Sequence, residues 1–529
     1  MAPLFRRGAA SLAISMVSIS LVLAVLATPN AATHPSMTQQ PARAGATEAF
    51  QELASKVRMK TLPNGLRVII VPRGEAPVVS FHTYVDVGSV DEKPGITGIA
   101  HMFEHMAFKG SSRIGSKNWE DEKRLLAAEE KAYNAWRAAS DAKDPKADVL
   151  KGDSSTRASS RSRWCRARST RRPSIAKGVG LNASTNTDAT QYFYSLPSNK
   201  IELWAWLESE RFADPVLREF YKERDVVQEE RRLRTDSNPM GKMIEEALMA
   251  SFEDHPYGRP VIGYQKDLEH FSRSEAEAFY KQTYGPSKMV LAIVGKVDPD
   301  KTFDLIERYF SRIPKNDPVP SPAQPAARKD GEKRIEVPLA AQPIYLASYR
   351  RPGVRSADDA VYSVIADILG GGEHSRLYKA LVKSGTAVAC QAILVFPGEK
   401  YSTGFVVFCV PARDKTLEEC EKAIDAELSR LAKDGPTAEE LEGVRLRAKA
   451  GFLDGIESNS GLARELSRNE AIGGGWKETF AEIAKIDAVT ADRVKAVAAS
   501  TFDTKNRTVA TIKSLPAKGR GAAPAGNGK

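Results

Sequence analysis

Apolar and polar residues follow one another along this 529-residue chain in patterns that predict strands and helices in two successive series. The first series has strand-like runs at 66–71, 77–87, 190–196 and 289–294, and helical patterns at 97–108, 200–212 and 217–233. The second has strand-like runs at 343–349, 388–396, 405–410 and 507–512, and helical patterns at 357–369, 375–383, 417–431 and 438–454. Strands and helices mixed throughout the chain indicate the α+β class.

The two series end in the same way. A helix opened by Ser274 leads to the strand at 289–294, and a helix opened by Thr490 leads to the strand at 507–512. Asn64-Gly65 also marks a tight turn before the run at 66–71, which predicts a hairpin. We therefore predict two homologous halves, each combining a β-sheet with helices.

Proline-rich and low-complexity stretches set the expected domain boundaries. Five prolines between 314 and 325 mark a linker, and a Gly/Ala/Pro-rich stretch follows 515. The predicted parts are a signal peptide at 1–32, a flexible lead-in at 33–58, an N-terminal domain at 59–313 with an irregular insertion at about 140–177, a linker at 314–333, a C-terminal domain at 334–514 and a disordered tail at 515–529.

The N-terminus has the layout of a secretory signal. Arg6 and Arg7 precede an apolar run at about 9–27, and the small residues Ala31 and Ala32 suit cleavage. We therefore expect a periplasmic or secreted protein. The run approaches the length that crosses a bilayer, so an uncleaved anchor is the alternative, and only then would the chain associate with a membrane.

The positive charge of the chain is concentrated in a few stretches. The formal charge is +10, of which residues 1–32 carry +2, residues 153–172 carry +6 and the tail after 515 carries +3. The remaining body has a charge of −1, and no basic stripe interleaved with aromatic residues is present. We therefore expect no nucleic-acid partner.

Four cysteines are too few for a disulfide framework in an exported chain of this length. Cys390 and Cys409 lie in strand-like apolar runs and form either two buried free thiols or one bridge between neighbouring strands. The chain has no Cys-x-x-Cys pair, which argues against a thiolate zinc site.

The strongest chemical signal is His101-Met102-Phe103-Glu104-His105, on the helix predicted at 97–108. His101 and His105 are four residues apart, so both imidazoles project from one helix face and can bind one Zn²⁺ ion. Glu104 lies on the same side, where it can take a proton from an attacking water without being a ligand. The pattern predicts a catalytic zinc site with one ion per chain.

A catalytic zinc site needs a third protein ligand, and the helix at 217–233 offers candidates. Phe220, Glu223, Val227 and Glu230 follow helical spacing, which places two carboxylates on an otherwise apolar stripe. Carboxylates are rarely buried unless they are paired or bind a metal. We prefer Glu230 as the ligand and Glu223 as the residue that holds a histidine's other nitrogen. A solvated helix face is the alternative.

The motif His-x-x-Glu-His followed by residues 223–230 strongly resembles the pitrilysin (insulinase-like) family of zinc metallopeptidases. That family includes the mitochondrial processing peptidase, and this chain is similar to its short-chain bacterial members. Three further segments match the family pattern: Asn64-Gly65-Leu66, Asn182-Ala183-Ser184-Thr185 and His255-Pro256-Tyr257. The similarity extends from about residue 59 to residue 512.

The resemblance implies a fold and a set of roles. The two homologous domains would face each other across a chamber, zinc would be held by His101, His105 and Glu230, and Glu104 would be the general base. An edge strand would pair with the backbone of extended or unfolded peptide substrates. The residues implied in that pairing are Asn182, Ala183, Ser184 and Thr185.

The chain departs from the family pattern at two places. Excess length falls between 120 and 177, where the Arg/Ser-rich stretch at 154–172 fits either a flexible insertion or a reading-frame error. Active members carry an Arg and a Tyr in the second domain that bind substrate, but here Val382 and Val388 occupy the expected positions. We expect a zinc-bearing subunit that works with a homologous subunit supplying this pair, or a homodimer. A non-catalytic scaffold or assembly subunit of the same fold is the alternative.

Overall fold

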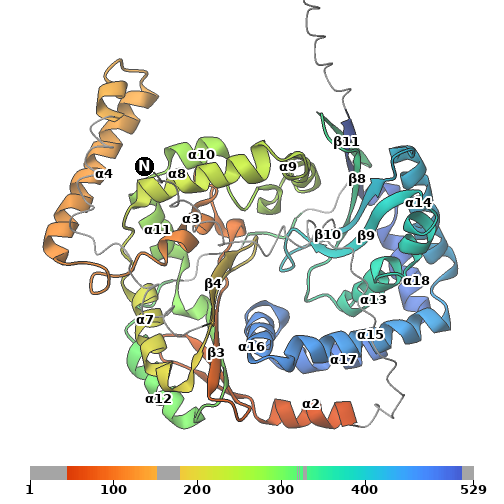
Figure 1. Ribbon diagram of the computed structural model, residues 1–529, viewed down its shortest axis with the longest axis horizontal. Helices are drawn as coiled ribbons and strands as arrows, with labels where there is room; N and C mark the ends of the chain where they lie inside the picture. Colours follow the sequence, from red (N-terminus) through yellow and green to blue (C-terminus); the bar gives the residue numbers. More distant parts are fainter. Residues whose placement is uncertain (1–44, 152–178, 318–319, 321, 326–330, 515–529) are drawn as a thin grey trace, which may run out of the picture. The chain divides into compact units, whose positions relative to one another are not determined.

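The computed structural model describes residues 45–151, 179–317, 320, 322–325 and 331–514. Their contacts divide the chain into two compact units. The first unit draws on Met1–Glu229, Arg259–Ala323 and Lys449–Ile483, and the second on Glu230–Gly258, Gln324–Ala448 and Ala484–Lys529. Each unit therefore contains one segment from the opposite half of the sequence (Figure 1). The domain boundaries expected from the sequence remain a prediction.

The first unit is built on a six-stranded mixed sheet with the order β1-β2-β6-β3-β5-β4. Its strands are β1 (Arg58–Thr61), β2 (Arg67–Pro72), β3 (Val78–Val85), β4 (Val179–Thr185), β5 (Thr190–Pro197) and β6 (Met289–Gly295). β2 and β6 are parallel, and the other neighbouring strands are antiparallel. β1 and β2 form the hairpin predicted at Asn64-Gly65, where Gly65 takes a φ of +95° that side chains disfavour.

The second unit repeats this plan with the strand order β7-β11-β8-β10-β9. Its strands are β7 (Lys333–Leu339), β8 (Ile344–Arg351), β9 (Ala387–Phe396), β10 (Thr403–Pro411) and β11 (Arg507–Ser514). β7 and β11 are parallel and the remaining pairs are antiparallel, the same directions as in β2-β6-β3-β5-β4. The predicted α+β fold with two similar sheets is confirmed.

Helices flank both sheets. Those of the first unit include α2 (Gly45–Ser55), α3 (Ile99–Met106), α4 (Trp119–Asp141), α7 (Ile201–Ala213), α8 (Phe220–Arg231), α10 (Gln265–His270), α11 (Arg273–Thr283), α12 (Pro299–Phe310) and α16 (Asn459–Arg468). Those of the second include α9 (Pro239–Ser251), α13 (Asp359–Gly370), α14 (Leu417–Asp434) and α18 (Ala491–Thr501). Like α8, whose last two residues belong to the second unit, α15 (Ala438–Glu457) and α17 (Glu478–Asp487) have residues in both units.

One predicted helix start is wrong. The sequence pattern assigned the opening of α11 to Ser274, but its N-cap is Ser272. The Ser272 hydroxyl accepts a hydrogen bond from the Glu275 backbone N–H, and the Glu275 carboxylate accepts one from the Ser272 N–H. This reciprocal capping box satisfies two backbone donors that the first helical turn otherwise leaves unpaired. The Thr490 start of α18 is confirmed.

The central strands of the first sheet are buried on both faces. Ile70 on β2 and Leu291 on β6 pack in the core that includes the helix α3. On the opposite face, Val290 packs in a second core that includes Leu462 of α16. Burial on both faces explains why β6 is a continuous apolar run rather than an alternating one.

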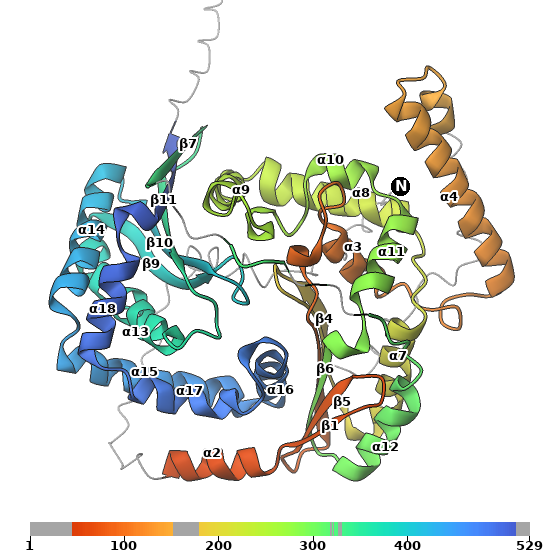
Figure 2. The same cartoon turned by 180° about the vertical axis from the view of Figure 1, so that it is seen from behind.

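The second faces of the two sheets are covered by helices from distant sequence positions. α16 contacts β3 and β6 in the first unit, and α9 contacts β11 and β7 in the second (Figure 2). Neither helix was predicted from the sequence. The coverage matters for the site because it leaves the opposite face of the first sheet to α3, which carries the histidine pair.

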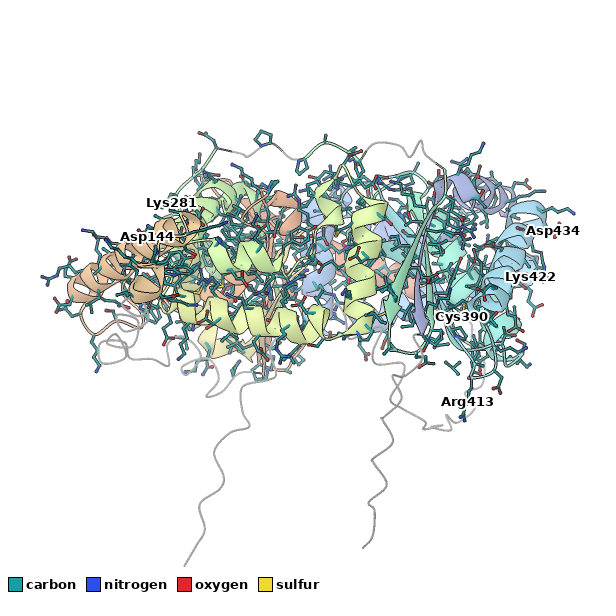
Figure 3. The ribbon with its side chains drawn as sticks, turned by 90° about the horizontal axis from the view of Figure 1, so that it is seen from above. Asp144, Lys281, Cys390, Arg413, Lys422 and Asp434 are labelled. Carbon is teal, nitrogen blue, oxygen red and sulfur yellow. The ribbon has the colours of Figure 1, made fainter. Side chains whose placement is uncertain are left out.

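The cysteines of the described segments are free thiols. Cys390 on β9 and Cys409 on β10 lie directly opposite each other across the antiparallel pair, and Cys420 of α14 is buried with them. Cys390 is labelled in Figure 3. Of the two alternatives that the sequence left open, the structure has the free thiols rather than the bridge.

The expected insertion is only partly within the described residues. Its start overlaps the long helix α4, which packs Leu126 and Tyr133 inward and ends before Asp144, labelled in Figure 3. The Arg/Ser-rich stretch at 154–172, the signal segment and the tail lie outside the described residues. Among the described helices, none has the length and apolar character needed to cross a membrane.

Candidate metal centre

The helix α3 exists because its apolar residues fill the core of the first unit. Ile99, Met102, Phe103 and Met106 are all at most 1% exposed. A helix of eight residues is too short to be stable alone, so these contacts hold it in place. Packing on the sheet thus fixes the segment that carries the predicted zinc motif.

His101 and His105 lie one turn apart on α3, as the spacing predicted. The centroids of their rings are 4.8 Å apart and the ring planes meet at 79°. His101 is 3% exposed and the His105 side chain is 11% exposed. The two imidazoles therefore lie close together at a site of low exposure.

Glu230 lies in the last turn of α8, whose preceding residues belong to the same unit as α3. The unit boundary falls between Glu229 and Glu230, so the continuous helix α8 carries Glu230 to its position. Phe220 and Val227 on the same stripe are fully buried, whereas Glu229 is exposed. The predicted inward stripe of this helix is therefore present.

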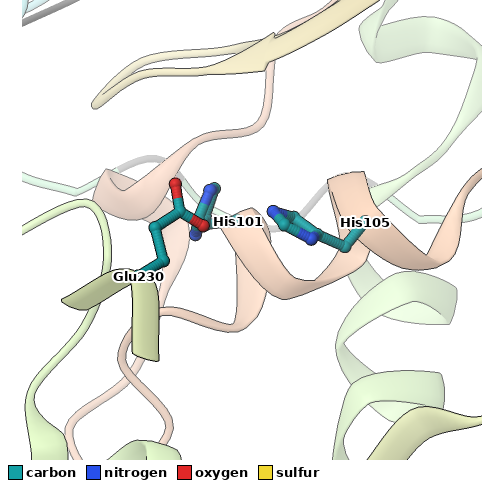
Figure 4. A group of neighbouring side chains, drawn as sticks. All are labelled: His101, His105 and Glu230. Atoms are coloured by element: carbon teal, nitrogen blue, oxygen red, sulfur yellow. The ribbon is translucent and has the colours of Figure 1, made fainter. Parts of the chain in front are cut away.

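The structure brings His101, His105 and Glu230 together. One ligand atom from each lies within 4.8 Å of the other two, and within the described residues no other group of His, Cys, Asp or Glu meets this condition. Figure 4 shows the Glu230 carboxylate directed towards the two rings from a second helix. Two imidazole nitrogens and one carboxylate oxygen are a donor set that zinc prefers, so these residues fit a zinc ion.

Glu223 contacts the other nitrogen of His105. The His105 Nδ1–H donates to Glu223 Oε1 at 3.1 Å, which leaves Nε2 for a metal. Lys109 Nζ lies 2.6 Å from Glu223 Oε2. Burial would raise the pKa of Glu223, but the hydrogen bond from His105 and the charge of Lys109 outweigh it and lower this pKa to about 2.

Glu104 is 1% exposed and lies near two buried phenols. Burial raises the pKa of both Tyr192 and Tyr284, and the negative charge of Glu104 raises each further. The phenols therefore stay neutral and add no competing charge beside Glu104. Such surroundings suit a carboxylate that moves protons.

Two contacts of the site have no clear signal in the sequence. Arg234, in the π-turn Arg232–Asp236 that follows α8, places Nη1 2.6 Å from Glu230 Oε1. Lys109 reaches Glu223 from the loop after α3. Arg234 and Lys109 each follow a site residue by four positions, but only the assembled site distinguishes them from other surface cations.

The residues expected to bind substrate lie on β4, the last strand of the first sheet. Asn182, Ala183, Ser184 and Thr185 pair with β5 on one side. Within the described segments no strand pairs with the other side. An open strand edge presents unpaired backbone N–H and C=O groups, which an extended peptide can bind. α3 contacts this strand directly.

Family profiles match both halves of the chain. The insulinase (peptidase family M16) profile matches residues 67–136, which include the histidine pair, and the profile described as the M16 inactive domain matches residues 270–447. The chain belongs to the M16 peptidase family. The resemblance inferred from the zinc motif is confirmed.

Relatives of this M16 chain are named as peptidases. The zinc protease PqqE of Helicobacter pylori is 26% identical over 79% of this chain and 84% of its own length. A probable mitochondrial-processing peptidase subunit beta of Arabidopsis thaliana is 23% identical over 84% of this chain and 76% of its own length. One of these relatives is thus named a zinc protease and the other a processing peptidase subunit.

Solved M16 structures share the fold. A protease from Helicobacter pylori aligns with a TM-score of 0.70 at 24% identity, over 87% of this chain and 99% of the other. The periplasmic protease PqqL from Escherichia coli aligns with a TM-score of 0.63 at 19% identity, over 87% of this chain and 48% of the other. At these identities the likeness establishes the two-sheet α+β fold.

Proposed function

We propose that this M16 chain is an exported zinc-dependent endopeptidase that cleaves extended or unfolded peptides. The proposal rests on the close approach of ligand atoms from His101, His105 and Glu230, with Glu104 buried one residue before His105. This is a three-ligand set that leaves a position open, the arrangement of catalytic rather than structural zinc.

Each side chain has a distinct role in the proposed reaction. His101, His105 and Glu230 hold the ion, and Glu223 keeps His105 oriented through its Nδ1–H. When bound, zinc polarises the scissile carbonyl and lowers the pKa of the attacking water. Glu104 takes the proton of that water and passes it to the departing amine.

Within the described segments β4 has an open edge, and this edge supports a preference for extended substrates. A peptide that adds a strand to this edge offers its backbone to hydrogen bonds along residues 182–185. A folded protein cannot release a segment for such pairing without partial unfolding. The proposed substrates are therefore flexible peptides or unfolded segments rather than compact domains.

Export is supported by the N-terminal sequence and by one neighbour. Arg6 and Arg7 followed by the apolar run at 9–27 fit a cleaved signal, and the structural neighbour PqqL is named a periplasmic protease. Sequencing the N-terminus of the mature protein tests this proposal. A mature chain that begins after about residue 32 supports cleavage, and one that begins at Met1 excludes it.

A two-subunit peptidase is the proposed working form. Val382 and Val388 stand where the family pattern has an Arg and a Tyr, and Val388 on β9 is 54% exposed. A hydrocarbon side chain cannot bind a substrate carbonyl, so a homologous subunit would supply this pair. Activity per mole of the purified chain should then fall on dilution and rise with the partner.

The second candidate function is a scaffold or assembly subunit without activity, and the same two valines favour it. Metal analysis combined with a peptide-cleavage assay separates the candidates. One zinc per chain together with cleavage of an unstructured peptide supports the endopeptidase. A chain that binds no zinc and cleaves nothing, alone or with its partner, supports the scaffold.

A further inference from the structure

The start of the zinc-motif helix α3 lacks a local cap. Its N-cap is Gly98, which takes a φ of +88° and has no side chain to accept a hydrogen bond. The first N–H groups of any helix have no intrahelical partner, and leaving them buried and unpaired is costly. A helix this short therefore needs an acceptor from elsewhere in the chain.

Glu92 supplies that acceptor from the preceding loop. Gly98 N–H donates to Glu92 Oε2 and Ala100 N–H donates to Glu92 Oε1, each at 2.9 Å. Both carboxylate oxygens of Glu92 are thus used on the helix start, and the residue is 4% exposed.

The Glu92 backbone is held as well. Arg259 Nη1 donates to the Glu92 carbonyl oxygen at 2.7 Å. Burial raises the pKa of the Glu92 carboxyl to about 8, while the two backbone N–H groups and the charge of Arg259 oppose the rise. Burying a carboxyl group costs free energy, so a buried carboxyl group beside the helix that carries the histidine pair indicates a positioning role.

A second carboxylate fixes the residue before the cap. Asp267 Oδ2 accepts from the Thr97 hydroxyl at 2.6 Å and from the Thr97 N–H at 3.1 Å. The backbone is also in close contact here, since a Cβ at Gly98 would lie 2.5 Å from the Ile262 carbonyl oxygen. The start of α3 therefore has little freedom to shift along or around its axis.

The geometry points to Glu92 as a positioning residue for α3. It sets the position of α3 along its axis and its rotation about that axis, and thereby the placement of His101 and His105 for zinc. His101 follows Ala100 directly, so a shift of the helix start moves the first ligand. Because ligand placement within fractions of an ångström decides metal affinity and turnover, Glu92 acts on the reaction through the helix.

The first test uses the wild-type chain and does not depend on the proposed function. Residue-resolved hydrogen exchange of the metal-free protein should show the Gly98 and Ala100 amides protected, although first-turn amides of a helix have no intrahelical partner. Rapid exchange of both amides would overturn the inference. A wild-type chain that binds no zinc would overturn the proposed function and leave this test intact.

The second test compares Glu92→Gln with Glu122→Gln. The amide nitrogen that Glu92→Gln introduces cannot accept a hydrogen bond, so hydrogen exchange of the α3 amides should quicken about fivefold. The zinc dissociation constant, measured by titration, should rise about 10-fold. The kcat should fall with KM unchanged. Glu122 is the matched control, a fully buried carboxylate that accepts hydrogen bonds from Arg218 Nε at 2.6 Å and Nη2 at 3.0 Å.

The control decides between positioning and general stability. Glu122→Gln should lower the melting temperature and leave zinc affinity unchanged. Equal losses of zinc affinity in both variants, or wild-type zinc affinity in Glu92→Gln, would contradict the positioning role, which rests on the proposed zinc site.

Discussion

His105 Nδ1 and Glu223 Oε1 lie 3.1 Å apart, and this hydrogen bond joins the helix that carries the histidine pair to the helix that carries Glu230. α3 and α8 come from sequence positions more than a hundred residues apart. One contact therefore both selects the histidine tautomer and sets the spacing between the two ligand-bearing helices.

Removing the Glu223 acceptor should weaken zinc binding. Glu223→Gln should raise the zinc dissociation constant about 10- to 100-fold, because His105 loses the charged partner that orients its ring. Competition with a chromophoric chelator measures the constant. Glu219→Gln is the control, since Glu219 pairs with Lys109 at 3.3 Å. Similar losses in both variants would argue against a specific role for Glu223.

Substitutions of the neighbouring Glu229 and Glu230 on α8 should have very different effects on zinc affinity. Glu230→Gln should cost zinc affinity by more than about 100-fold, because removing a direct ligand exceeds the cost of removing its support. Glu229 is exposed, and Glu229→Gln should bind zinc as the wild type does. Metal content after dialysis distinguishes the two variants. A Glu230→Gln chain that keeps a full equivalent of zinc would remove Glu230 from the ligand set.

The stability of the protein should fall with acid through His82. Burial, aided by the charge of Arg464, lowers the pKa of His82 to about 3, and Ser467 Oγ lies 2.8 Å from its Nδ1. Because the unfolded chain binds a proton at His82 below about pH 6.5 and the folded chain does not, this contribution is complete above 6.5 and is lost towards pH 3.

The slope of that loss is about 1.4 kcal/mol of unfolding free energy per pH unit. His82→Gln should flatten the slope between pH 6 and pH 4, as measured by urea unfolding at each pH. An unchanged slope in the variant would mean that His82 is protonated in the folded protein.

The packing of α16 on the first sheet is testable by truncation. Leu462 is fully buried in the core that includes Val290, so Leu462→Ala should cost about 2–5 kcal/mol of unfolding free energy. The Arg464 side chain is 55% exposed, and Arg464→Ala should cost less than about 0.5 kcal/mol. Equal effects in urea unfolding would contradict the description of α16 as part of this core.

Local signals in the sequence place the candidate ligands on their helices. The histidine spacing on α3 is a property of one helical turn, and the inward stripe of α8 follows from periodicity alone. β6 could be predicted because burial on both faces produces a continuous apolar run. Each of these features depends on residues within one element.

Features that depend on distant contacts could not be predicted. Glu92 is one acid among 67 Asp and Glu, and nothing in its neighbours indicates that it caps a helix six residues later. α16 covers a sheet whose strands come from the other half of the sequence. The start of α11 was misplaced by two residues because Ser272 and Ser274 are equal candidates until the Glu275 contact is known.

The central claim is that His101, His105 and Glu230 hold a zinc ion beside the general base Glu104. The most direct test measures zinc content and cleavage of an unstructured peptide together. Both are measured on the wild type and on Glu104→Gln, with any partner present. We predict one zinc per chain in both proteins and a loss of at least about 100-fold in kcat for the variant. Cleavage by Glu104→Gln at the wild-type rate, or a wild type without zinc, would contradict the account.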